Sequence, residues 1–221
     1  FNFQYSNSSD IPRYDKLIEQ RNGTLRYAEW FYGPQKRILI APQLKLFPQK
    51  RFMNSGRITF AYQNIDESRN SRAFESFIRK TQKENVEVWS LNGDFEFELN
   101  QKHSFSYGFE GTLNRVRSFA FGKELVVQQN EVIALKPSAP SPTRYPSKGS
   151  TYDSFASFVN WIWDLNNELT INFGMRFTNT TLEARWKEYY NINALLEAVN
   201  LDALALTQTL ALTYRPNEKI Q

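Results

Sequence analysis

Hydrophobic and polar side chains alternate along much of the chain, and the stretch 84–118 shows this pattern most fully. Over Trp89–Leu99 the odd positions are aromatic, aliphatic or glycine, whereas the even positions are serine, asparagine, aspartate or glutamate. After a polar break at 100–103, the same alternation resumes over Phe105–Leu113. Because successive side chains of a β-strand point to opposite faces, this stretch predicts a long hairpin with one apolar and one polar face.

Two environments accept such a hairpin. A soluble sheet would bury the apolar face in a protein core and expose the polar face to water. An outer-membrane barrel would place the apolar face on lipid and the polar face on an aqueous lumen. A transmembrane strand needs about 9–11 residues, and both arms of the hairpin supply that length. The hairpin alone therefore leaves both alternatives open.

The same alternation recurs in other parts of the chain. Further strands are predicted at 1–8, 28–47, 57–63, 152–165, 169–178 and 204–214. With the two arms of the hairpin, this gives about eight strands, as counted from the period-two pattern. Apolar residues at helical spacing predict one short helix within 187–200.

The connections between these strands alternate in length. Short turns are predicted near Pro48, Gln101, Asn166 and Asn217, and long connections near Arg21, Ser76, Ser138 and Ala194. Transmembrane barrels have short periplasmic turns and longer extracellular loops, whereas a soluble sandwich has no physical reason to place every long loop at one end. The pattern therefore predicts an all-β fold, an antiparallel transmembrane β-barrel segment.

Composition removes several classes of function. The 221 residues include no cysteine and one histidine, which excludes disulfides and thiolate chemistry and leaves little basis for a histidine-based metal or catalytic site. No apolar run approaches the ~18 residues of a membrane-spanning helix. The formal net charge of +4 is small and spread along the chain, so we expect no nucleic-acid partner. We expect a protein that is not an enzyme and that holds no cofactor or metal.

Several segments, taken in order, resemble the central barrel strands of TonB-dependent receptors, especially those of the Bacteroidetes type. These segments are Trp30–Gln35, Ala61–Arg69, Ser106–Glu110, Arg144–Pro146, Gly174–Phe177 and Tyr214–Pro216. The resemblance implies a barrel of about 22 strands whose lumen is blocked by an N-terminal plug. It also implies that residues 1–221 are a partial barrel domain of about eight strands, with the plug and the remaining strands absent from it.

The resemblance further implies a cellular location and a function. The protein would lie in the outer membrane of a Gram-negative bacterium and take up a scarce nutrient such as an iron chelate, haem or cobalamin. Its partners would be outer-membrane lipid and lipopolysaccharide, the plug of the same protein, the TonB energy-transducing complex acting through that plug, and the nutrient ligand. Two alternatives remain: a small self-contained outer-membrane barrel with a structural or adhesive role, and a soluble β-sandwich or lipocalin-like binding module.

Aromatic and charged residues at the predicted outer strand ends are candidates for ligand binding, because arginine forks and aromatic rings commonly anchor ligands. The candidates are Tyr27, Trp30, Tyr32, Glu67, Arg69, Arg72, Arg144, Tyr145 and Tyr152. The alternative for the charged ones is a solvated run in a loop.

A second group lies on the polar positions of the predicted strands. Its members are Asn92, Asp94, Glu96, Glu110, Asn172 and Arg176. Barrel interiors are polar by construction, so we interpret these residues as lumen wall rather than as an acid–base pair or a calcium site. In the family that they resemble, this wall faces the plug.

Overall fold

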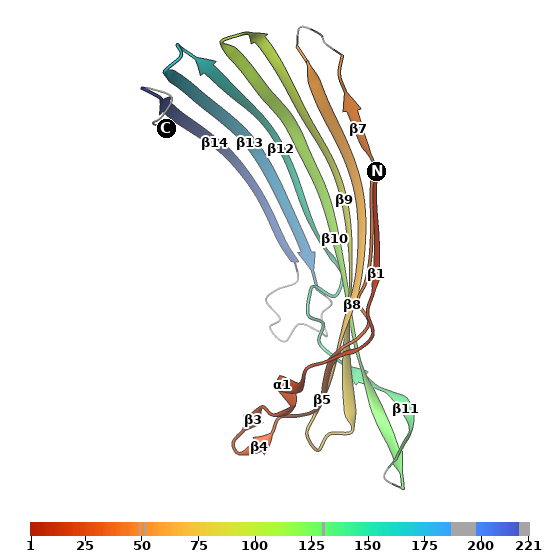
Figure 1. Cartoon of the computed structure of the whole chain (residues 1–221). Coiled ribbons are helices and arrows are strands. Elements are labelled where there is room, and N and C mark those ends of the chain that lie inside the picture. The colour runs from red at the N-terminus through yellow and green to blue at the C-terminus, as the bar shows by residue number, and fades with distance from the viewer. Residues whose placement is uncertain (49, 51, 130, 187–197, 217–221) are drawn as a thin grey trace.

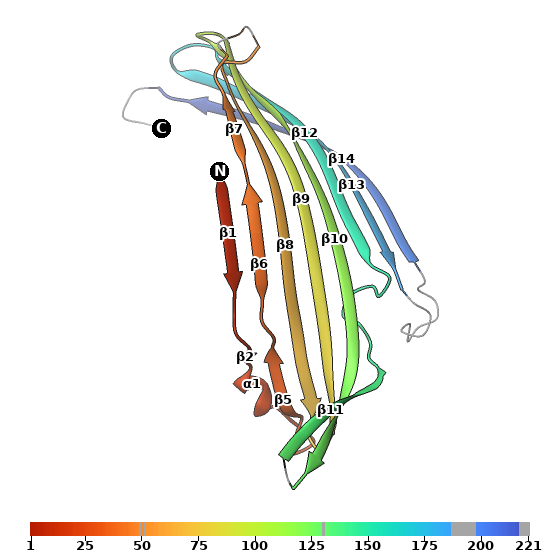
Figure 2. The same ribbon diagram turned by 90° about the vertical axis from the view of Figure 1, so that its right-hand side faces the viewer.

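The computed structural model describes residues 1–48, 50, 52–129, 131–186 and 198–216, and most of them belong to one twisted antiparallel sheet. Its main strands in spatial order are β1 (Asn2–Asn7), β6 (Lys36–Ala41), β8 (Ser55–Ala73), β9 (Ile78–Asn100), β10 (His103–Gln128), β12 (Ser150–Asp164), β13 (Leu169–Arg185) and β14 (Ala198–Tyr214). Figures 1 and 2 show these strands side by side in a bowed wall. The predicted all-β, antiparallel fold is confirmed.

Smaller elements gather at one end of this wall. They are β2 (Ile11–Pro12), α1 (Tyr14–Leu17), β3 (Gln20–Arg21), β4 (Thr24–Leu25), β5 (Tyr27–Tyr32) and β11 (Glu131–Pro140). We call this the loop end, and we call the opposite end, where β9 joins β10 and β12 joins β13, the turn end (Figure 1). β7 (Gln43–Leu46) pairs with β8 near the turn end. Among the described residues, no helix is both long and apolar enough to cross a membrane.

The sheet is open. Its order begins at β1 and ends at β14, which lie at opposite edges. The part of the chain that the structure describes thus forms a curved wall rather than a barrel closed on itself, which does not match the self-contained barrel considered as an alternative. A segment of a larger barrel has this form, because its edge strands pair with strands outside the segment.

The prediction of a single strand over 28–47 is wrong, because the structure divides this stretch into β5, β6 and β7. The first break contains Pro34 and the second is Pro42. Proline has no backbone N–H to donate to the ladder, so each proline interrupts the pairing with β8. The peptide oxygen of Pro42 still accepts a hydrogen bond from the N–H of Phe60 at 3.2 Å, which keeps the chain close to β8.

Two of the long connections expected at the loop end are instead continuous strands. β8 and β9 run through the charged stretch 66–83 and meet at a four-residue turn, 74–77. β10 likewise continues to Gln128 and pairs with β11, which contains two prolines at an edge of the sheet. Sequence periodicity missed these extensions because neither face of a strand beyond the bilayer has to be apolar.

The short helix expected within 187–200 falls mainly on residues outside the described part of the chain. Residues 198–200 are described, and they form the start of β14 rather than a helix. The expected turns near Gln101 and Asn166 are confirmed, because β9–β10 and β12–β13 are joined there by short connections.

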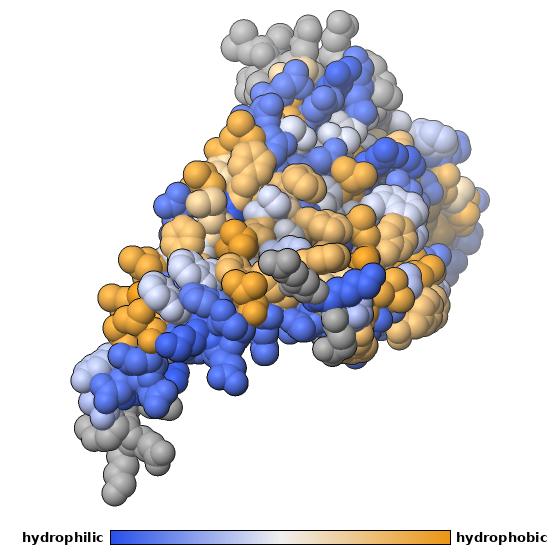
Figure 3. Space-filling view, turned by 90° about the horizontal axis from the view of Figure 1, so that it is seen from above, coloured by the Kyte–Doolittle hydropathy of each residue, from blue (hydrophilic) through white to orange (hydrophobic). Residues whose placement is uncertain are grey.

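The strand register collects the apolar side chains on one face, which we call the outer face. One row of paired residues crosses five strands there: Phe97, Phe105, Trp161, Phe173 and Leu210. The rings of Phe97 and Phe105 stack with centroids 4.8 Å apart. Apolar side chains gather in broad patches when the wall is viewed from the turn end (Figure 3).

The outer face is not a protein core. Leu91 is 43% exposed and Leu210 is 69% exposed, and the buried hydrophobic residues of the described chain are three alanines and Leu125. No second sheet among the described strands covers this face, since β3–β4 is the only other sheet there. A soluble sandwich would bury these side chains in a second layer, so the structure contradicts that alternative.

The opposite face, which we call the inner face, is polar and concave. Figure 1 shows α1 and the β3–β4 hairpin on the concave side of the wall. Arg13, at the start of α1, contacts Trp30 and Tyr32, and Tyr32 pairs with Arg69. Arg69 has the same strand parity as the polar residues of β8, so the polar face is the concave one.

The apolar band of the outer face has a sharp boundary toward the loop end. On each strand, moving two residues along the outer face replaces an apolar side chain by a polar one: Tyr5 to Asn7, Ile38 to Lys36, Tyr62 to Asn64, Trp89 to Glu87, Leu113 to Arg115, Phe155 to Asp153, Phe177 to Asn179 and Leu204 to Asp202. This alignment defines one level at which the outer face meets a polar medium.

From β6 to β13 the boundary also moves through the register in one direction, and at β14 it steps back, because Leu204 is apolar and pairs with Asn179. Ile38 is apolar although Asn64, which pairs with it on β8, is already polar. Leu113 on β10 is apolar although its partner on β12, Asp153, is polar. A band of constant height produces such a stagger when the strands are tilted, as they are in barrels. The pattern therefore matches a lipid-facing band crossed by tilted strands.

A charge placed in the middle of this band should destabilise the protein strongly. We expect Phe173→Arg to cost roughly 2–4 kcal/mol in the free energy of unfolding from lipid vesicles, because the outer face at that level meets hydrocarbon. Asn172→Arg, one residue away on the inner face, should have a mild effect. Equal costs in a urea titration would contradict the assignment of the two faces.

Close packing between β9 and β10 gives a second prediction. A Cβ atom added at Gly108 would lie 2.1 Å from the backbone oxygen of Gly93 and 2.8 Å from the ring of Phe158. The backbone oxygen cannot yield, so Gly108→Ala should destabilise the protein by about 1–3 kcal/mol. At Gly111 the nearest atom is 3.8 Å away, so Gly111→Ala is the matched control with little loss. The two unfolding free energies test this; an equally stable Gly108→Ala would refute it.

Candidate ligand-binding face

An aromatic pair on the inner face begins the candidate site at the loop end. β5 pairs with the last residues of β8, which sets Tyr32 opposite Arg69 and Trp30 on the same face. The rings of Trp30 and Tyr32 meet edge to face with centroids 4.9 Å apart. The guanidinium of Arg69 lies 5.4 Å from the Tyr32 ring centre, within the range of a cation–π contact.

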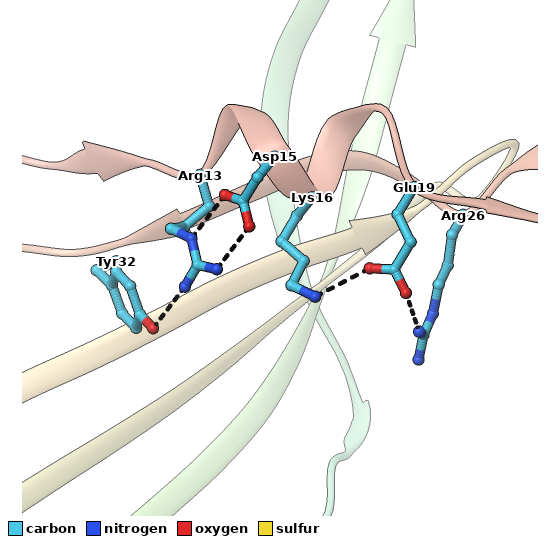
Figure 4. Close-up of polar contacts among 6 residues, drawn as sticks. All are labelled: Arg13, Asp15, Lys16, Glu19, Arg26 and Tyr32. Carbon is cyan, nitrogen blue, oxygen red and sulfur yellow. Dashed lines mark hydrogen bonds and ion pairs between the residues drawn. The ribbon is translucent and has the colours of Figure 1, made fainter.

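Helix α1 brings a second guanidinium to the same rings (Figure 4). Arg13 lies 5.3 Å from the Trp30 ring centre and 5.7 Å from that of Tyr32, and its Nη1 donates a 3.0 Å hydrogen bond to the Tyr32 hydroxyl. Asp15 holds this arginine through contacts of 2.7 and 2.6 Å. The hydrogen bonds from Arg13 hold the pKa of the Asp15 carboxyl below its ordinary value, so the pair stays ionised.

A second ion pair fixes the chain that follows α1. Glu19 accepts hydrogen bonds from Lys16 at 3.0 Å and from Arg26 at 2.5 Å (Figure 4). Both hydrogen bonds lower the pKa of the Glu19 carboxyl. The pair closes the short β3–β4 hairpin against α1, and the hairpin leads directly into β5. Exposed pairs of this kind contribute little stability, so their effect here is to orient the segment.

The segment before β12 returns across the inner face and adds a third element. The Nε2 of Gln82 donates to the oxygen of Pro142 at 3.0 Å, and the N–H of Tyr145 donates to the hydroxyl of Ser118 at 3.3 Å. Between these anchors, Arg144 forms a 2.9 Å ion pair with Glu67. The guanidinium of Arg144 also lies 4.9 Å from the Tyr145 ring centre.

A buried carboxylate lies beneath this segment. Glu84 is 2% exposed and pairs in the sheet with Glu67 on one side and Ser118 on the other. The Ser118 hydroxyl donates to its Oε1 at 3.5 Å, whereas its Oε2 has no hydrogen-bond partner among the described residues. Burial and the nearby charge of Glu67 raise the pKa of the Glu84 carboxyl, and the charges of Arg144 and Arg69 oppose this only in part. We call Tyr32, Glu67, Arg69, Glu84 and Arg144 the mouth cluster.

One arginine of the mouth cluster has hydrogen-bonding capacity to spare. The Nε of Arg69 is buried and has no hydrogen-bond partner among the described residues. A guanidinium carries five N–H donors in a fixed planar fork, which matches carboxylate or phosphate oxygens. Because this Nε is buried, an anionic ligand would meet the other N–H groups of the guanidinium, with the rings of Trp30 and Tyr32 beside them.

The remaining predicted ligand residues lie apart from the mouth cluster. Tyr27 pairs with Ala73 near the end of β8, and the guanidinium of Arg26 lies 5.0 Å from its ring. Tyr152 lies on the inner face of β12 and is 48% exposed. Arg72 has the outer-face parity of β8 and forms a 3.0 Å ion pair with Glu29. The structure thus brings together Trp30, Tyr32, Glu67, Arg69, Arg144 and Tyr145.

The predicted wall residues share the inner face closer to the turn end. Asn92, Asp94 and Glu96 follow one another on β9, opposite Thr59, Arg57 and Ser55 of β8. The hydroxyl of Ser55 donates to the Oε2 of Glu96 at 3.0 Å. Arg176 of β13 reaches across β12 to form an ion pair with Glu110 of β10, and Asn172 lies on the same face of β13. The described wall is therefore polar and partly neutralised by its own ion pairs.

The family model for the β-barrel of TonB-dependent receptors, described as "TonB dependent receptor-like, beta-barrel", matches residues 1–221. The chain belongs to this family. Members of the family are transporters of the Gram-negative outer membrane rather than enzymes. Among curated protein sequences, none matches the chain.

Solved structures of the same kind resemble this TonB-dependent receptor segment. The copper transporter OprC matches with a TM-score of 0.63 and 9% identity, covering 86% of this chain and 29% of its own. The unliganded ferric citrate transporter FecA matches with a TM-score of 0.60 and 14% identity, covering 98% and 31%. The siderophore receptor PiuA from Acinetobacter baumannii gives 0.53 and 11%, covering 98% and 37%. The chain thus spans about a third of the length of these proteins, and the likeness shows the fold.

Sequence reasoning missed three residues of the receptor's loop end. Arg13 lies in a polar segment without periodicity, so nothing in the sequence placed it over Trp30. Glu84 and Ser118 could have been found, because each has the inner-face parity of its strand and the hairpin register pairs them. The alternation predicts a hairpin that begins and ends at these two positions, whereas both strands continue beyond them.

The contact between Glu29 and two arginines gives a pH prediction outside the membrane band. Burial raises the pKa of Glu29, but hydrogen bonds from Arg79 and Arg72 outweigh it and keep the pKa below its ordinary value. A carboxyl with a lowered folded-state pKa stabilises the fold above its unfolded pKa and loses this effect as the pH falls through the folded one. Glu29→Gln should therefore cost about 1–3 kcal/mol at neutral pH, and the difference should shrink in acid.

The control for Glu29→Gln is Glu183→Gln. Glu183 is 60% exposed and lies 3.8 Å from its arginine, so its replacement should change the free energy of unfolding little at any pH. Unfolding titrations of both variants at neutral and acid pH measure the effect. A pH-independent cost at Glu29 would contradict the ionic origin of this contact.

Proposed function

We propose that the protein carrying this segment is a TonB-dependent outer-membrane transporter, and that the mouth cluster takes part in binding the nutrient it imports. Residues 1–221 would form part of the barrel wall, with the plug and the other strands lying outside them. The match of the whole segment to the receptor barrel family supports the class. The guanidinium groups of Arg13 and Arg69, beside the edge-to-face rings of Trp30 and Tyr32 on the concave face, are the observation that carries the binding site.

The chemistry of this site favours an anionic ligand with a flat, unsaturated part. Arg69 presents its guanidinium group on the Tyr32 ring, and such groups bind carboxylate and phosphate oxygens in a bidentate manner. Arg13 adds a second guanidinium beside the same ring, with its fork already occupied by Asp15. Trp30 and Tyr32 add apolar area that suits conjugated rings. An anionic iron chelate or haem meets both requirements, and cobalamin is a further candidate. The solved structures named above are described as carrying copper, ferric citrate and siderophores, which agrees with a metal chelate.

The polar wall would contact the plug in the complete barrel. Asp94, Glu96 and Glu110 carry charges on the inner face at the level of the apolar band, where water or a polar protein surface must meet them. A plug that hydrogen-bonds to this wall would block the lumen until the TonB complex pulls it. Force applied to the plug, rather than bond chemistry at the wall, would then admit the nutrient.

Uptake by whole cells tests this function. Cells that lack the gene and cells that carry it would be given radiolabelled iron as citrate, as a catecholate chelate and as haem. We expect accumulation of at least one of these only in cells with the gene, and only while TonB is present and the proton gradient is intact. Uptake that persists without TonB, or no gene-dependent uptake of any metal chelate, would contradict the proposal.

Substitution within the mouth cluster locates the binding site. We expect Arg69→Ala to weaken binding of the imported chelate about tenfold or more, which corresponds to about 1.4 kcal/mol. Lys36→Ala, on the outer face of the neighbouring strand β6, is the matched control and should bind normally. Ligand titration of the full-length variants in detergent measures both. Equal affinities would place the nutrient elsewhere.

A further inference from the structure

A short segment, residues 141–149, links β11 to β12 at the loop end (Figure 1). We call it the strap. It forms no strand, and two of its residues, Pro142 and Pro146, have no backbone N–H to donate to a ladder. Its position across the inner face therefore depends on a few individual contacts with side chains of the sheet.

The strap is anchored to three strands in turn. The anchors are hydrogen bonds with Gln82 of β9 and Ser118 of β10, and the ion pair of Arg144 with Glu67 of β8. Each anchor involves a side chain of the sheet rather than its backbone. The strap can therefore lift from the wall without breaking any pairing between strands.

A carboxyl group lies buried under the strap. Glu84 is 2% exposed, whereas Gln82 and Val86, its neighbours on the inner face of β9, are only partly buried. Two anchors of the strap, Ser118 and Glu67, are the residues that pair with Glu84 on either side in the sheet. The strap thus closes over this carboxyl, and lifting it would admit water to Glu84.

The charged groups that face Glu84 come from β8 and from the strap. Glu67 and Arg69 approach it from β8, and Arg144 approaches it from the strap. β10 contributes the neutral hydroxyl of Ser118, at 3.5 Å from Oε1, and the inner-face neighbours on β9 carry no charge. Arg144 is engaged by Glu67, and the Oε2 of Glu84 has no hydrogen-bond partner among the described residues.

This environment disfavours the ionised form of Glu84 while the strap is closed. Burying a carboxylate with too few donors costs far more than burying the neutral carboxyl. Burial and the charge of Glu67 accordingly raise the pKa of Glu84, and water would lower it again if the strap opened. A carboxyl whose pKa is higher in the closed state favours closure at low pH, and this effect is lost as the pH rises through that pKa.

We propose that the strap is a pH-sensitive latch, which is closed while Glu84 carries a proton and released when this carboxyl ionises. In the closed state Arg69, Arg144 and Glu67 leave one positive charge in excess, which attracts an anion. Release carries Arg144 away and leaves Arg69 beside two carboxylates, which weakens that attraction. The latch thus couples capture of an anion to mild acid. This effect on binding rests on the proposed function of the mouth cluster, whereas the movement of the strap does not.

A spin label on the strap tests the latch without any nutrient. The label is attached after Thr143→Cys in a full-length protein cleared of other cysteines, and its mobility is recorded in lipid vesicles from about pH 4 to about pH 9, a range that begins near the ordinary pKa of glutamate. We expect an immobile label in acid and a mobile one in alkali, with the ratio of the two populations changing up to about tenfold per pH unit.

Two substitutions on β9 assign this response to one carboxyl. Glu84→Gln keeps the shape of the side chain and cannot ionise, so the label should stay immobile at every pH. Glu96→Gln is the matched control, because Glu96 lies on the inner face of the same strand and is hydrogen-bonded to Ser55, away from the strap. This variant should keep the wild-type response.

The other outcomes decide against the latch. A wild-type label whose mobility does not change with pH would overturn it, as would a Glu84→Gln variant that still responds. The same response from a label at Thr207, on the inner face of β14, would show a general loosening of the wall instead. Should Glu84→Gln fail to fold, as judged by heat-modifiable gel mobility, Glu84→Ala supplies the test, since it also lacks an ionisable group. A defect in nutrient uptake has no bearing on the label, so the two proposals fail separately.

Discussion

The structure depends on one constraint: inside a lipid bilayer every backbone N–H and C=O must be paired within the protein. The long antiparallel ladders from β8 to β14 satisfy this constraint between neighbouring strands of the described wall, and its two edge strands would pair with further strands of a closed barrel. Their side chains are then free to differ between the two faces, because alternate residues point to opposite sides. The outer face can consist of Phe, Leu and Trp while the inner face carries Asp, Glu and Arg, without any protein core between them.

The same constraint explains where irregular structure and chemistry occur. Within the apolar band the strands are continuous except at Pro42, between β6 and β7. By contrast, α1, β3–β4 and the segment before β12 lie beyond the band, where water can satisfy backbone groups. The strands that continue past the band carry charges on both faces. On the inner face these charges meet in the mouth cluster, and on the outer face Arg115, Arg117, Glu183 and Arg185 line one shared hollow. Each face thus changes its chemistry at the level at which the surrounding medium changes.

The sequence predicts which segments form strands and on which face each side chain lies. Within the apolar band, lipid on one side and water on the other impose the period-two pattern. The alternation over Leu169–Phe177 gave β13, and the parity of Glu110 and Arg176 placed both on the inner face, where they form an ion pair. Beyond the band the pattern carries no such information. The extensions of β8, β9 and β10 were therefore interpreted as loops. The contact of Arg13 with Trp30 and Tyr32 depends on the path of an aperiodic segment, which no local pattern encodes.

The central claim is that the outer face touches hydrocarbon and the inner face lines an aqueous space. The 221 residues contain no cysteine, so single-cysteine substitutions at each position from Thr170 to Phe177 can be made in a full-length protein cleared of cysteines elsewhere, followed by spin labelling in lipid vesicles. The account predicts that accessibility to oxygen peaks at the odd positions and accessibility to a water-soluble nickel complex peaks at the even ones, with a period of two residues. Accessibility without this period, or with the two reagents exchanged, would contradict it.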